Sequence, residues 1–333
     1  MSRFLQRIWY EGTPPRLWLR ALVPVYRSLR ALHLAPYRLG WRRPLRLPVP
    51  VVVVGNLTAG GSGKTPLVIA LVEALRERGF RPGVVSRGYG GGERGPLLLP
   101  ADADPARVGD EPCLIRHRTG APVAVGRRRP EAAALLAVQG ADVVVADDGL
   151  QNPSLARDVE LCVIDGARRL GNGLLLPAGP LREPAGRLAT VDFRICNGGA
   201  PLPGEYAMTL AGGEAVTLFA PERRRPLDAF AGQRVHAVAG IGNPERFFAS
   251  LRDHGIEVVP HAFPDHHAFT PDDLRFADAL PVLMTEKDAI KCRAFAGDGW
   301  WQVPVRAELP DDFFDKVAAR LAAAAGLEAG SRS

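Results

Sequence analysis

Lysine is nearly absent from this 333-residue sequence, although basic residues are plentiful. Of its 42 basic residues, 38 are arginines and four are lysines, at positions 64, 287, 291 and 316. Such a bias reflects codon composition rather than chemistry. It nevertheless draws attention to the lysines that remain.

Cysteine is also scarce, and its spacing excludes the usual paired arrangements. The four cysteines, which stand at neither metal-ligand nor redox spacing, are Cys113, Cys162, Cys196 and Cys292. We therefore expect reduced, mostly buried thiols in a cytosolic protein. No window of about 18 uncharged apolar residues occurs, which excludes an ordinary transmembrane helix. The first residues include Arg3 and Arg7 and no charge-free apolar core, so we expect no secretory signal.

Acidic residues are almost missing from the first 48 residues. This leader holds ten arginines and one acid, Glu11, whereas the rest of the chain carries 32 basic and 35 acidic residues. The composition, 47% hydrophobic and 23% charged, excludes a disordered chain and a polytopic membrane protein. A nucleic-acid enzyme more often spreads its basic charge over the folded body, so we expect no nucleic acid as a partner. A basic leader indicates an anionic membrane surface or another anionic partner.

The leader contains a predicted helix over residues 16–34. At about 100° per residue, four arginines share one arc and five large apolar residues share the opposite face. The arc comprises Arg16, Arg20, Arg27 and Arg30, and the apolar face comprises Trp18, Leu22, Val25, Leu29 and Leu32. Such a helix is typical of a membrane interface, with a kink expected at Pro24. The same periodicity also fits a helix docked on its own domain with the arginines in water.

From residue 49 the chain alternates short β-branched runs with helical stretches. Strands are predicted at 51–54, 83–86, 123–125, 143–146, 161–164 and 191–196, with helices at 65–78 and 130–139. This order predicts an α/β fold: a parallel sheet with helices on both faces. A second series predicts a smaller α/β domain, with strands at 235–239, 256–259, 282–284 and 302–305 and helices at 244–252, 271–278 and 311–325.

These patterns divide the chain into five expected segments. Composition turns loop-like over 197–204 and 221–226, which places a boundary there. The segments are a basic amphipathic membrane-associated leader (1–48), a nucleotide-binding core (49–200), a linker (201–230), a smaller C-terminal α/β domain (231–326) and a frayed tail (327–333).

The first predicted strand runs into a glycine-rich loop, GNLTAGGSGKTP, at residues 55–66. A strand, a loop ending in Gly63-Lys64-Thr65 and a helix form the arrangement of a P-loop NTPase-type fold. Backbone N–H groups can surround an anion there, Lys64 would contact the β- and γ-phosphates, and Thr65 would ligate Mg²⁺. Thr58 stands where the general pattern has glycine. The expected nucleotide-binding residues are Thr58, Ala59, Gly60, Gly61, Ser62, Gly63, Lys64 and Thr65.

Carboxylates follow at two places. The run VVVADDG puts Asp147 and Asp148 at the carboxyl end of a strand beside the P-loop strand, where they would coordinate Mg²⁺ directly or through water. Alternatively, such a residue caps the next turn. The run VGDEP puts Asp110 and Glu111 on a predicted loop, where a carboxylate could accept a proton from an attacking hydroxyl. Taken alone, Asp110 would more often be a helix cap.

Eight motifs then occur in one order along the chain. They are TAGGSGKTP (58–66), SRGYG (86–90), VGDEP (108–112), DDGLQ (147–151), LPAGPLREP (176–184), GIGNPERFF (240–248), FPDHHAFT (263–270) and TEKDAIKC (285–292). Together with the basic leader, this set resembles the tetraacyldisaccharide 4′-kinase family of the lipid A pathway, over residues 10 to 320. The P-loop alone is weakly specific, whereas the ordered set is highly specific. Thr58 is itself the family's form of the loop.

The resemblance implies an ATP- and Mg²⁺-dependent kinase. It would phosphorylate the 4′-hydroxyl of a tetraacyl disaccharide 1-phosphate, giving lipid IVA, as a peripheral enzyme on the cytoplasmic face of the inner membrane. The implied partners are that acylated lipid and the anionic membrane surface. The implied roles are phosphate and Mg²⁺ binding for Lys64 and Thr65, catalytic base for Asp110, pairing with that base for His266, metal binding for Asp147 and Asp148, and substrate binding for Arg87, Tyr89, Arg129 and Asn172.

One position departs from the family pattern, and the roles of three groups of charged or titratable residues remain open from the sequence. The family commonly has histidine where this chain has Asn152, which cannot become cationic. His266 and His267 could form an ordinary surface pair, whereas zinc would need a third ligand that the spacing does not offer. The arginines at 127–129 could form a solvated helix entrance or contact an anionic substrate. Lys287 and Lys291 are candidates for phosphate contacts.

Two other functions compete with a kinase. The first is a GTPase, in which the motif [NT]-K-x-D after a strand recognises the guanine base. Here the order is Thr285-Glu286-Lys287-Asp288, with lysine one place late, which argues against guanine recognition. An NTP-switched membrane adaptor would need no small-molecule substrate. The discriminating feature is a carboxylate placed for a substrate hydroxyl, which Asp110 could supply. An adaptor would hydrolyse ATP without a lipid acceptor, whereas a kinase would barely do so.

Overall fold

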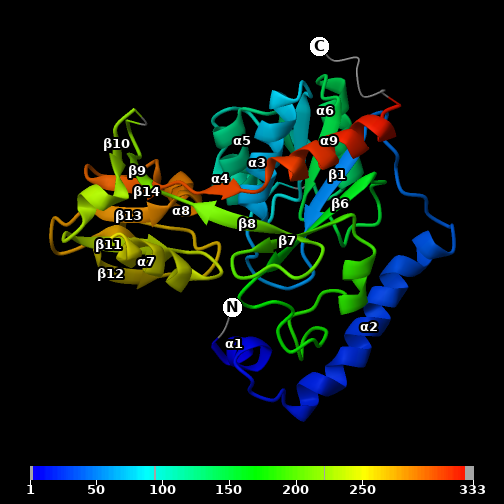
Figure 1. The fold of residues 1–333 in the computed structure, drawn as a ribbon, viewed down its shortest axis with the longest axis horizontal. Helices are drawn as coiled ribbons and strands as arrows, with labels where there is room; N and C mark the ends of the chain where they lie inside the picture. The colour runs from blue at the N-terminus through cyan, green and yellow to red at the C-terminus, as the bar shows by residue number, and fades with distance from the viewer. Residues whose placement is uncertain (1–2, 94, 221, 327–333) are drawn as a thin grey trace.

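Two β-sheets, each flanked by helices, lie side by side in the computed structural model (Figure 1). The structure describes residues 3–93, 95–220 and 222–326, so the predicted tail at 327–333 lies outside the described residues. The larger sheet carries the P-loop strand, and the smaller one is built from the C-terminal part of the chain. The arrangement confirms the predicted α/β class and a second, smaller α/β unit.

The larger sheet has nine strands. In spatial order they are β15 (Arg306–Glu308), β8 (Glu205–Ala211), β7 (Phe193–Asn197), β6 (Val159–Asp165), β1 (Val51–Gly55), β5 (Val143–Asp147), β2 (Pro82–Ser86), β4 (Val123–Val125) and β3 (Leu97–Leu98). Neighbours are parallel except at the two edges, where β3 and β15 run antiparallel. Every residue of β1, β5 and β2 is buried, as expected of parallel strands covered on both faces.

Helices cover both faces of this sheet. On one face, α3 (Lys64–Glu77), α5 (Asp110–Thr119) and α9 (Asp311–Ala324) share a single apolar cluster with the strands. The other face packs against α6 (Arg129–Val138) and against the chain before β1 and after β5. The short α4 (Pro105–Val108) precedes α5. Since the P-loop joins β1 to α3, the packing of both elements holds the loop at the carboxyl end of the central strand.

The smaller sheet has six strands and two main helices. In spatial order the strands are β10 (Arg224–Pro226), β9 (Glu214–Thr217), β14 (Trp300–Val303), β13 (Val282–Thr285), β11 (Arg234–Ala239) and β12 (Glu257–Ala262). The last four pair in parallel, and β9 and β10 add an antiparallel edge. The helices are α7 (Pro244–Asp253) and α8 (Glu286–Cys292). The helix predicted at 271–278 is wrong in extent, because only a 3₁₀ turn forms, at Pro271–Leu274.

The segment predicted as a linker, 201–230, is instead part of both sheets. It supplies β8 to the large sheet and β9 and β10 to the small one. After the small sheet, β15 and α9 return to the large one, where Phe313 and Leu321 are fully buried. Strands of three to seven residues among glycines and prolines carry too little periodicity to be recognised. The packing of α9 on the large sheet leaves no local sequence signal.

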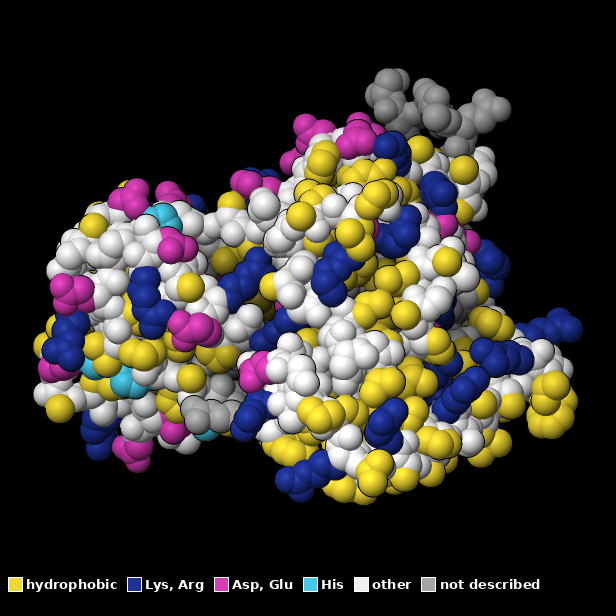
Figure 2. Space-filling model, turned by 60° about the horizontal axis from the view of Figure 1, so that its bottom comes forward, with side chains coloured by type: hydrophobic (Ala, Val, Ile, Leu, Met, Phe, Trp, Pro, Cys, Tyr) yellow, Lys and Arg dark blue, Asp and Glu magenta, His cyan; other side chains and the backbone are white. Residues whose placement is uncertain are grey.

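The leader folds into α1 (Arg3–Tyr10) and α2 (Leu17–Arg38), which agrees with the helix predicted at 16–34. Its apolar face is open to solvent: Leu29 is 62% exposed and Leu32 71%. The alternative of a helix docked on its own domain is right in that α2 contacts the body, where Leu19 is buried. It is wrong in that the apolar face stays exposed and Arg30 pairs with Glu183 and is not in water. Figure 2 shows hydrophobic and basic side chains interleaved over the lower right of the molecule, where α2 lies. No helix in the described ranges is long and apolar enough to cross a bilayer.

Candidate functional site

The phosphate-binding loop connects β1 to α3. Gly63 precedes α3 at φ 91°, a left-handed backbone conformation that suits glycine, and an added Cβ would lie 2.2 Å from Asn197 Nδ2. Gly60 and Gly61, which precede the amino end of α3, are exposed. Within the loop, the side-chain amide of Asn56 donates to the carbonyl of Thr58 (2.8 Å). The loop is thus shaped for an anion, with Lys64 and Thr65 opening the helix behind it.

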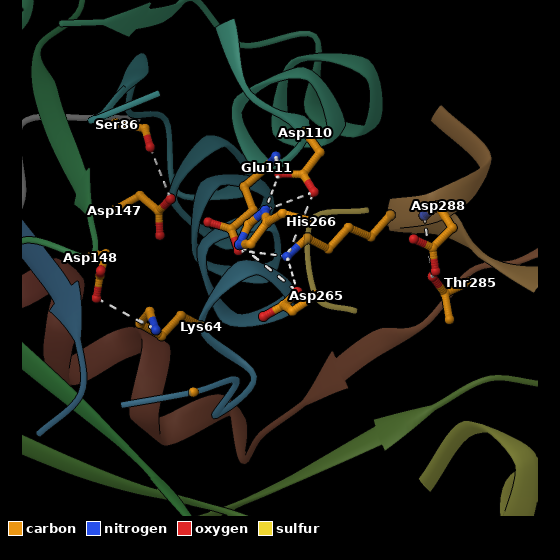
Figure 3. Close-up of polar contacts among 12 residues, drawn as sticks. Lys64, Ser86, Asp110, Glu111, Asp147, Asp148, Asp265, His266, Thr285 and Asp288 are labelled. Carbon is orange, nitrogen blue, oxygen red and sulfur yellow. Dashed lines mark hydrogen bonds and ion pairs between the residues drawn. The ribbon is translucent and has the colours of Figure 1, made fainter. Parts of the chain in front are cut away.

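Asp147 ends β5 and lies in register with Val54 of β1, beside the loop. Its Oδ2 accepts a hydrogen bond from Ser86 Oγ (3.2 Å), whereas its Oδ1 is buried with no partner among the described residues (Figure 3). Burial raises the pKa of Asp147 above its usual range, and the charges of Glu111 and Asp148 raise it further. A buried carboxylate oxygen without a donor is a free ligand for a cation.

Asp148 faces Lys64. The Lys64 ammonium lies 3.5 Å from its Oδ1, and Arg182 Nη1 donates to its Oδ2 at 3.1 Å. Burial alone would raise the pKa of Asp148, but Lys64 and Arg182 outweigh it and lower that pKa to about 2. Asp147 and Asp148 are neighbours at the end of β5, yet Asp147 holds its proton more tightly than Asp148 does. Asp148 also has φ 48°, an uncommon conformation for a residue with a side chain.

Asp110 and His266 come together from the two sheets. Asp110 is the first residue of α5, not part of a loop as predicted, and its Oδ1 accepts from the N–H of Glu111 (2.9 Å). His266, in the loop after β12, places Nδ1 3.1 Å from both carboxylate oxygens. Burial opposes ionisation of Asp110, but the hydrogen bond from His266 and the charge of Lys287 lower its pKa. The same hydrogen bond raises the pKa of His266, against the effect of burial.

Lys287 holds this pair in a wider charged cluster that sequence reasoning missed. Its Nζ lies 3.1 Å from Glu111, 3.2 Å from Asp265 and 3.8 Å from Asp110. Burial would lower the pKa of Lys287, but these three carboxylates raise it. The sequence makes Lys287 a candidate for a phosphate contact, whereas its contacts in the structure are carboxylates. The sequence signal for this cluster is a lysine in a lysine-poor chain, which marks Lys287 as a candidate functional residue but does not predict which side chains it contacts.

The predicted substrate residues fall into two groups. Tyr89 is 65% exposed, and its ring centroid lies 5.1 Å from that of His266. Arg129 is buried at the start of α6, and burial lowers its pKa. The charges of Asp148 and Asp147 oppose this shift, and the charge of Arg87 adds to it. Tyr89 therefore lies beside the Asp110–His266 pair, and Arg129 lies near Asp147 and Asp148. Asn172 does not join them: its Nδ2 donates to the carbonyls of Ile8 (3.2 Å) and Ala178 (2.9 Å), which ties a loop to α1.

Two further positions gain a structural explanation. Asn152, where the resemblance leads one to expect histidine, accepts from the N–H (2.9 Å) and hydroxyl (2.6 Å) of Ser154 and so closes a turn. Asp288 is fully buried, accepts from the N–H of Gly240 (2.8 Å) and pairs with Lys291 (2.8 Å). Because its carboxylate is buried and already paired, Asp288 stabilises the fold and is not available to recognise a guanine base, as the GTPase alternative would require.

The small sheet also touches the phosphate loop, through residues that sequence reasoning missed. A Cβ added to Gly242 would lie 3.0 Å from the Gly61 nitrogen. Asn197, at the end of β7, donates to the carbonyl of Ser62 (2.9 Å) and accepts from Arg246 Nη2 of α7 (3.2 Å). Residues of both sheets therefore border the loop as well as Asp110.

Comparison with known proteins gives a consistent result. The model of the family described as tetraacyldisaccharide-1-P 4′-kinase (LpxK) matches residues 15–322. The chain is 53% identical over 323 residues to the tetraacyldisaccharide 4′-kinase of Stenotrophomonas maltophilia, covering 94% of this chain and 95% of that protein. It is 55% identical over 326 residues to the protein of the same name from Xanthomonas euvesicatoria, covering 94% of each.

A solved structure is similar as well. It is the crystal structure of LpxK from Aquifex aeolicus in complex with ATP, at 27% sequence identity and a TM-score of 0.74. The likeness covers 91% of this chain and 98% of that one. Such coverage includes both sheets, so the fold is shared as a whole and not in the P-loop part alone.

Proposed function

This chain belongs to the tetraacyldisaccharide-1-P 4′-kinase family, and on that premise we propose that it transfers the γ-phosphoryl group of ATP to the 4′-hydroxyl of a tetraacyl disaccharide 1-phosphate, giving lipid IVA. The observation that carries the proposal is Asp110, a buried carboxylate held 3.1 Å from His266 Nδ1 near the acidic pair of the P-loop. A neutral sugar hydroxyl is a poor nucleophile, so a nearby base must take its proton.

The remaining residues divide the work around the transferring group. Lys64 and the N–H groups of the glycine-rich loop stabilise charge on the phosphates. Asp110 accepts the hydroxyl proton, and His266 holds Asp110 in position. Tyr89, Arg87 and Arg129 border the same space and offer contacts to an anionic sugar. Asn172 is not assigned a substrate contact, because its amide is engaged by backbone.

Mg²⁺ fits the acidic pair. The buried Oδ1 of Asp147 lacks a donor among the described residues. Asp148, the next residue, and Thr65, the second residue of α3, would supply further oxygen ligands. A divalent cation would hold Asp147 ionised despite its burial. When bound, Mg²⁺ neutralises part of the negative charge on the β- and γ-phosphates.

The leader supports a site of action at a membrane surface. Helix α2 exposes Trp18, Leu22, Val25, Leu29 and Leu32 on one face and carries arginines on the other. A helix with an exposed apolar face and a basic polar face lies in the headgroup region of an anionic bilayer. We place the protein as a peripheral enzyme on the cytoplasmic face of the inner membrane, where an acylated substrate resides.

The experiment that tests the proposal is transfer of label from γ-labelled ATP to tetraacyl disaccharide 1-phosphate in detergent micelles. We expect label in the lipid at the 4′ position and little ATP hydrolysis when the lipid is omitted. Asp110→Asn should abolish transfer, whereas Asp272→Asn, an exposed carboxylate outside the site, should not. Hydrolysis that proceeds equally without lipid, with no label in the lipid, would contradict the proposal and indicate an NTP-switched adaptor.

A further inference from the structure

Helix α2 contacts the body of the protein along one stripe. Leu19, Val23, Tyr26 and Arg30 repeat at spacings of 4, 3 and 4, which puts them on a single helix face. Leu19 is buried with Ile8 and Ala178 in a small apolar cluster, and Val23 packs at its margin. Further along, Tyr26 and Arg30 make polar contacts with the segment just before Pro184. The stripe is separate from the exposed apolar face of the same helix.

These polar contacts end on two consecutive residues. Tyr26 Oη donates to the backbone carbonyl of Arg182 (2.9 Å), and Arg30 Nη2 donates to Glu183 Oε2 (2.5 Å). The Glu183 side chain is 5% exposed and that of Arg30 is 25% exposed. A buried carboxylate requires a cationic partner, and Arg187, a second arginine paired with Glu183, lies farther away at 3.7 Å. Arg30 is thus the closer counterion of Glu183.

The segment that receives α2 is joined to the phosphate loop by its backbone. The N–H of Arg182 donates to the carbonyl of Leu57 (2.7 Å), and the N–H of Ala59 donates to the carbonyl of Pro180 (2.8 Å). Between them, Thr58 and Leu181 form an isolated β-bridge. A shift of the segment would therefore move the first residues of the loop with it.

Side chains make a second connection to the same place. Arg182 Nη1 donates to Asp148 (3.1 Å), while Glu183 Oε1 accepts from Gln151 Nε2 (2.9 Å). Gln151 Nε2 in turn donates to the backbone carbonyl of Asn56 (3.0 Å). The paths meet at Lys64, whose ammonium lies 3.3 Å from Asn56 Oδ1 and 3.5 Å from Asp148.

We infer that Tyr26 and Arg30 are positioning residues for the nucleotide site: through Arg182 and Glu183 they set the place of Asp148 and of Lys64 in the phosphate loop. The inference rests on the proposed function in taking ATP as the ligand of that loop. Without Arg30, Glu183 would lose its closer counterion, and the segment that carries Arg182 to Asp148 would shift. The helix that faces the lipid would thus also hold the nucleotide loop in its binding geometry.

The test is binding of a non-hydrolysable ATP analogue with Mg²⁺ to the full chain in detergent, without lipid substrate. Arg30→Gln should raise the Kd for the analogue about tenfold, the lower end of what a binding site loses when a residue that orients its ligands, without touching the bound group, is removed. Arg27→Gln, which removes the same charge from an exposed position on the same helix, should change the Kd less than about twofold. Tyr26→Phe should raise the Kd by a smaller factor than Arg30→Gln, and Arg30→Lys should restore part of the affinity.

A double-variant cycle separates a positioning role from a purely structural one. If Arg30 acts through Glu183, adding Arg30→Gln to Glu183→Gln should weaken binding little further. A lower Tm for Arg30→Gln with an unchanged Kd would overturn the inference, as would equal effects of Arg30→Gln and Arg27→Gln. Should the wild type bind the analogue but fail to phosphorylate the lipid, the proposed function would fail, while the comparison of these variants would still decide the inference.

Discussion

Two residues of the site have an uncommon backbone conformation. Asp148 has φ 48° and His266 has φ 62°, in the left-handed region where side chains other than glycine seldom occur. Each such residue costs of the order of 1–3 kcal/mol, and the cost is tolerated where the surroundings fix the conformation. Asp148 is fixed by Lys64 and Arg182, and His266 by Asp110. The charged partners therefore hold both residues in the orientations that the chemistry uses.

Lys64 offers the simplest test at this scale. Its ammonium lies at the loop between Asn56 and Asp148, where it would meet the transferring phosphate. Lys64→Ala should lower turnover by at least about 10²–10³-fold, as removal of a charge-stabilising donor does in other sites. The Tm should change little. Lys316→Ala, which removes an exposed lysine of α9, serves as the control, and normal turnover in Lys64→Ala would contradict the assigned role.

The His266 pair predicts a pH dependence of stability. Because the pKa of His266 is raised on folding, its ion pair with Asp110 contributes fully below the unfolded pKa of about 6.5. The contribution is lost as pH rises through the folded pKa. The Tm advantage of the wild type over His266→Gln should therefore shrink between pH 6 and pH 9, as followed by thermal unfolding. A constant advantage across that range would mean that the imidazole is not charged in the folded state.

At the scale of elements, α2 combines two faces with different tasks. The periodicity of residues 16–34 predicts the helix and its apolar face but cannot say which stripe touches the protein, since Tyr26 and Arg30 meet a segment about 150 residues away. α5 was missed for a related reason. Its first turn contains Pro112 and it has no apolar stripe, so the sequence predicts a loop at Asp110 and Glu111, although these residues begin a helix.

The exposed face of α2 carries its own prediction. Leu29→Asp together with Leu32→Asp should lower binding to anionic vesicles more than about tenfold, because the apolar side chains no longer enter the interface. Both positions are exposed, so the Tm should stay near that of the wild type. Val138→Asp, at an 83% exposed position on α6, is the matched control. Unchanged co-sedimentation of the double variant would remove α2 as the lipid-binding surface.

At the scale of the whole molecule, the site belongs to neither sheet alone. The P-loop, the acidic pair and Asp110 come from the large sheet's side, while His266 and Lys287 come from the small one. Across the same interface, Arg118 on α5 donates to both oxygens of Glu286 on α8 (2.9 and 2.8 Å). This contact fixes α8, and with it Lys287, against the helix that Asp110 begins.

Sequence reasoning therefore reached the fold class and the P-loop but not the assembly of the site. Each parallel strand and the loop after β1 carry local patterns, and the carboxylates at the end of β5 follow from sheet geometry. The meeting of Asp110 with His266, 156 positions apart, has no local signal and came only from family resemblance. The same holds for Lys287, Asn197 and Arg246, whose partners are set by how the two sheets face each other.

The most direct test of the account is a double-variant kinetic cycle on Asp110 and His266, measured as labelled phosphate transferred to the lipid. Asp110→Ala should lower turnover severely with little change in KM for ATP, and His266→Ala should do so to a lesser extent. If the two residues act as one unit across the sheets, the double variant should be hardly slower than Asp110→Ala. Losses that multiply independently would contradict a site assembled from both parts of the chain.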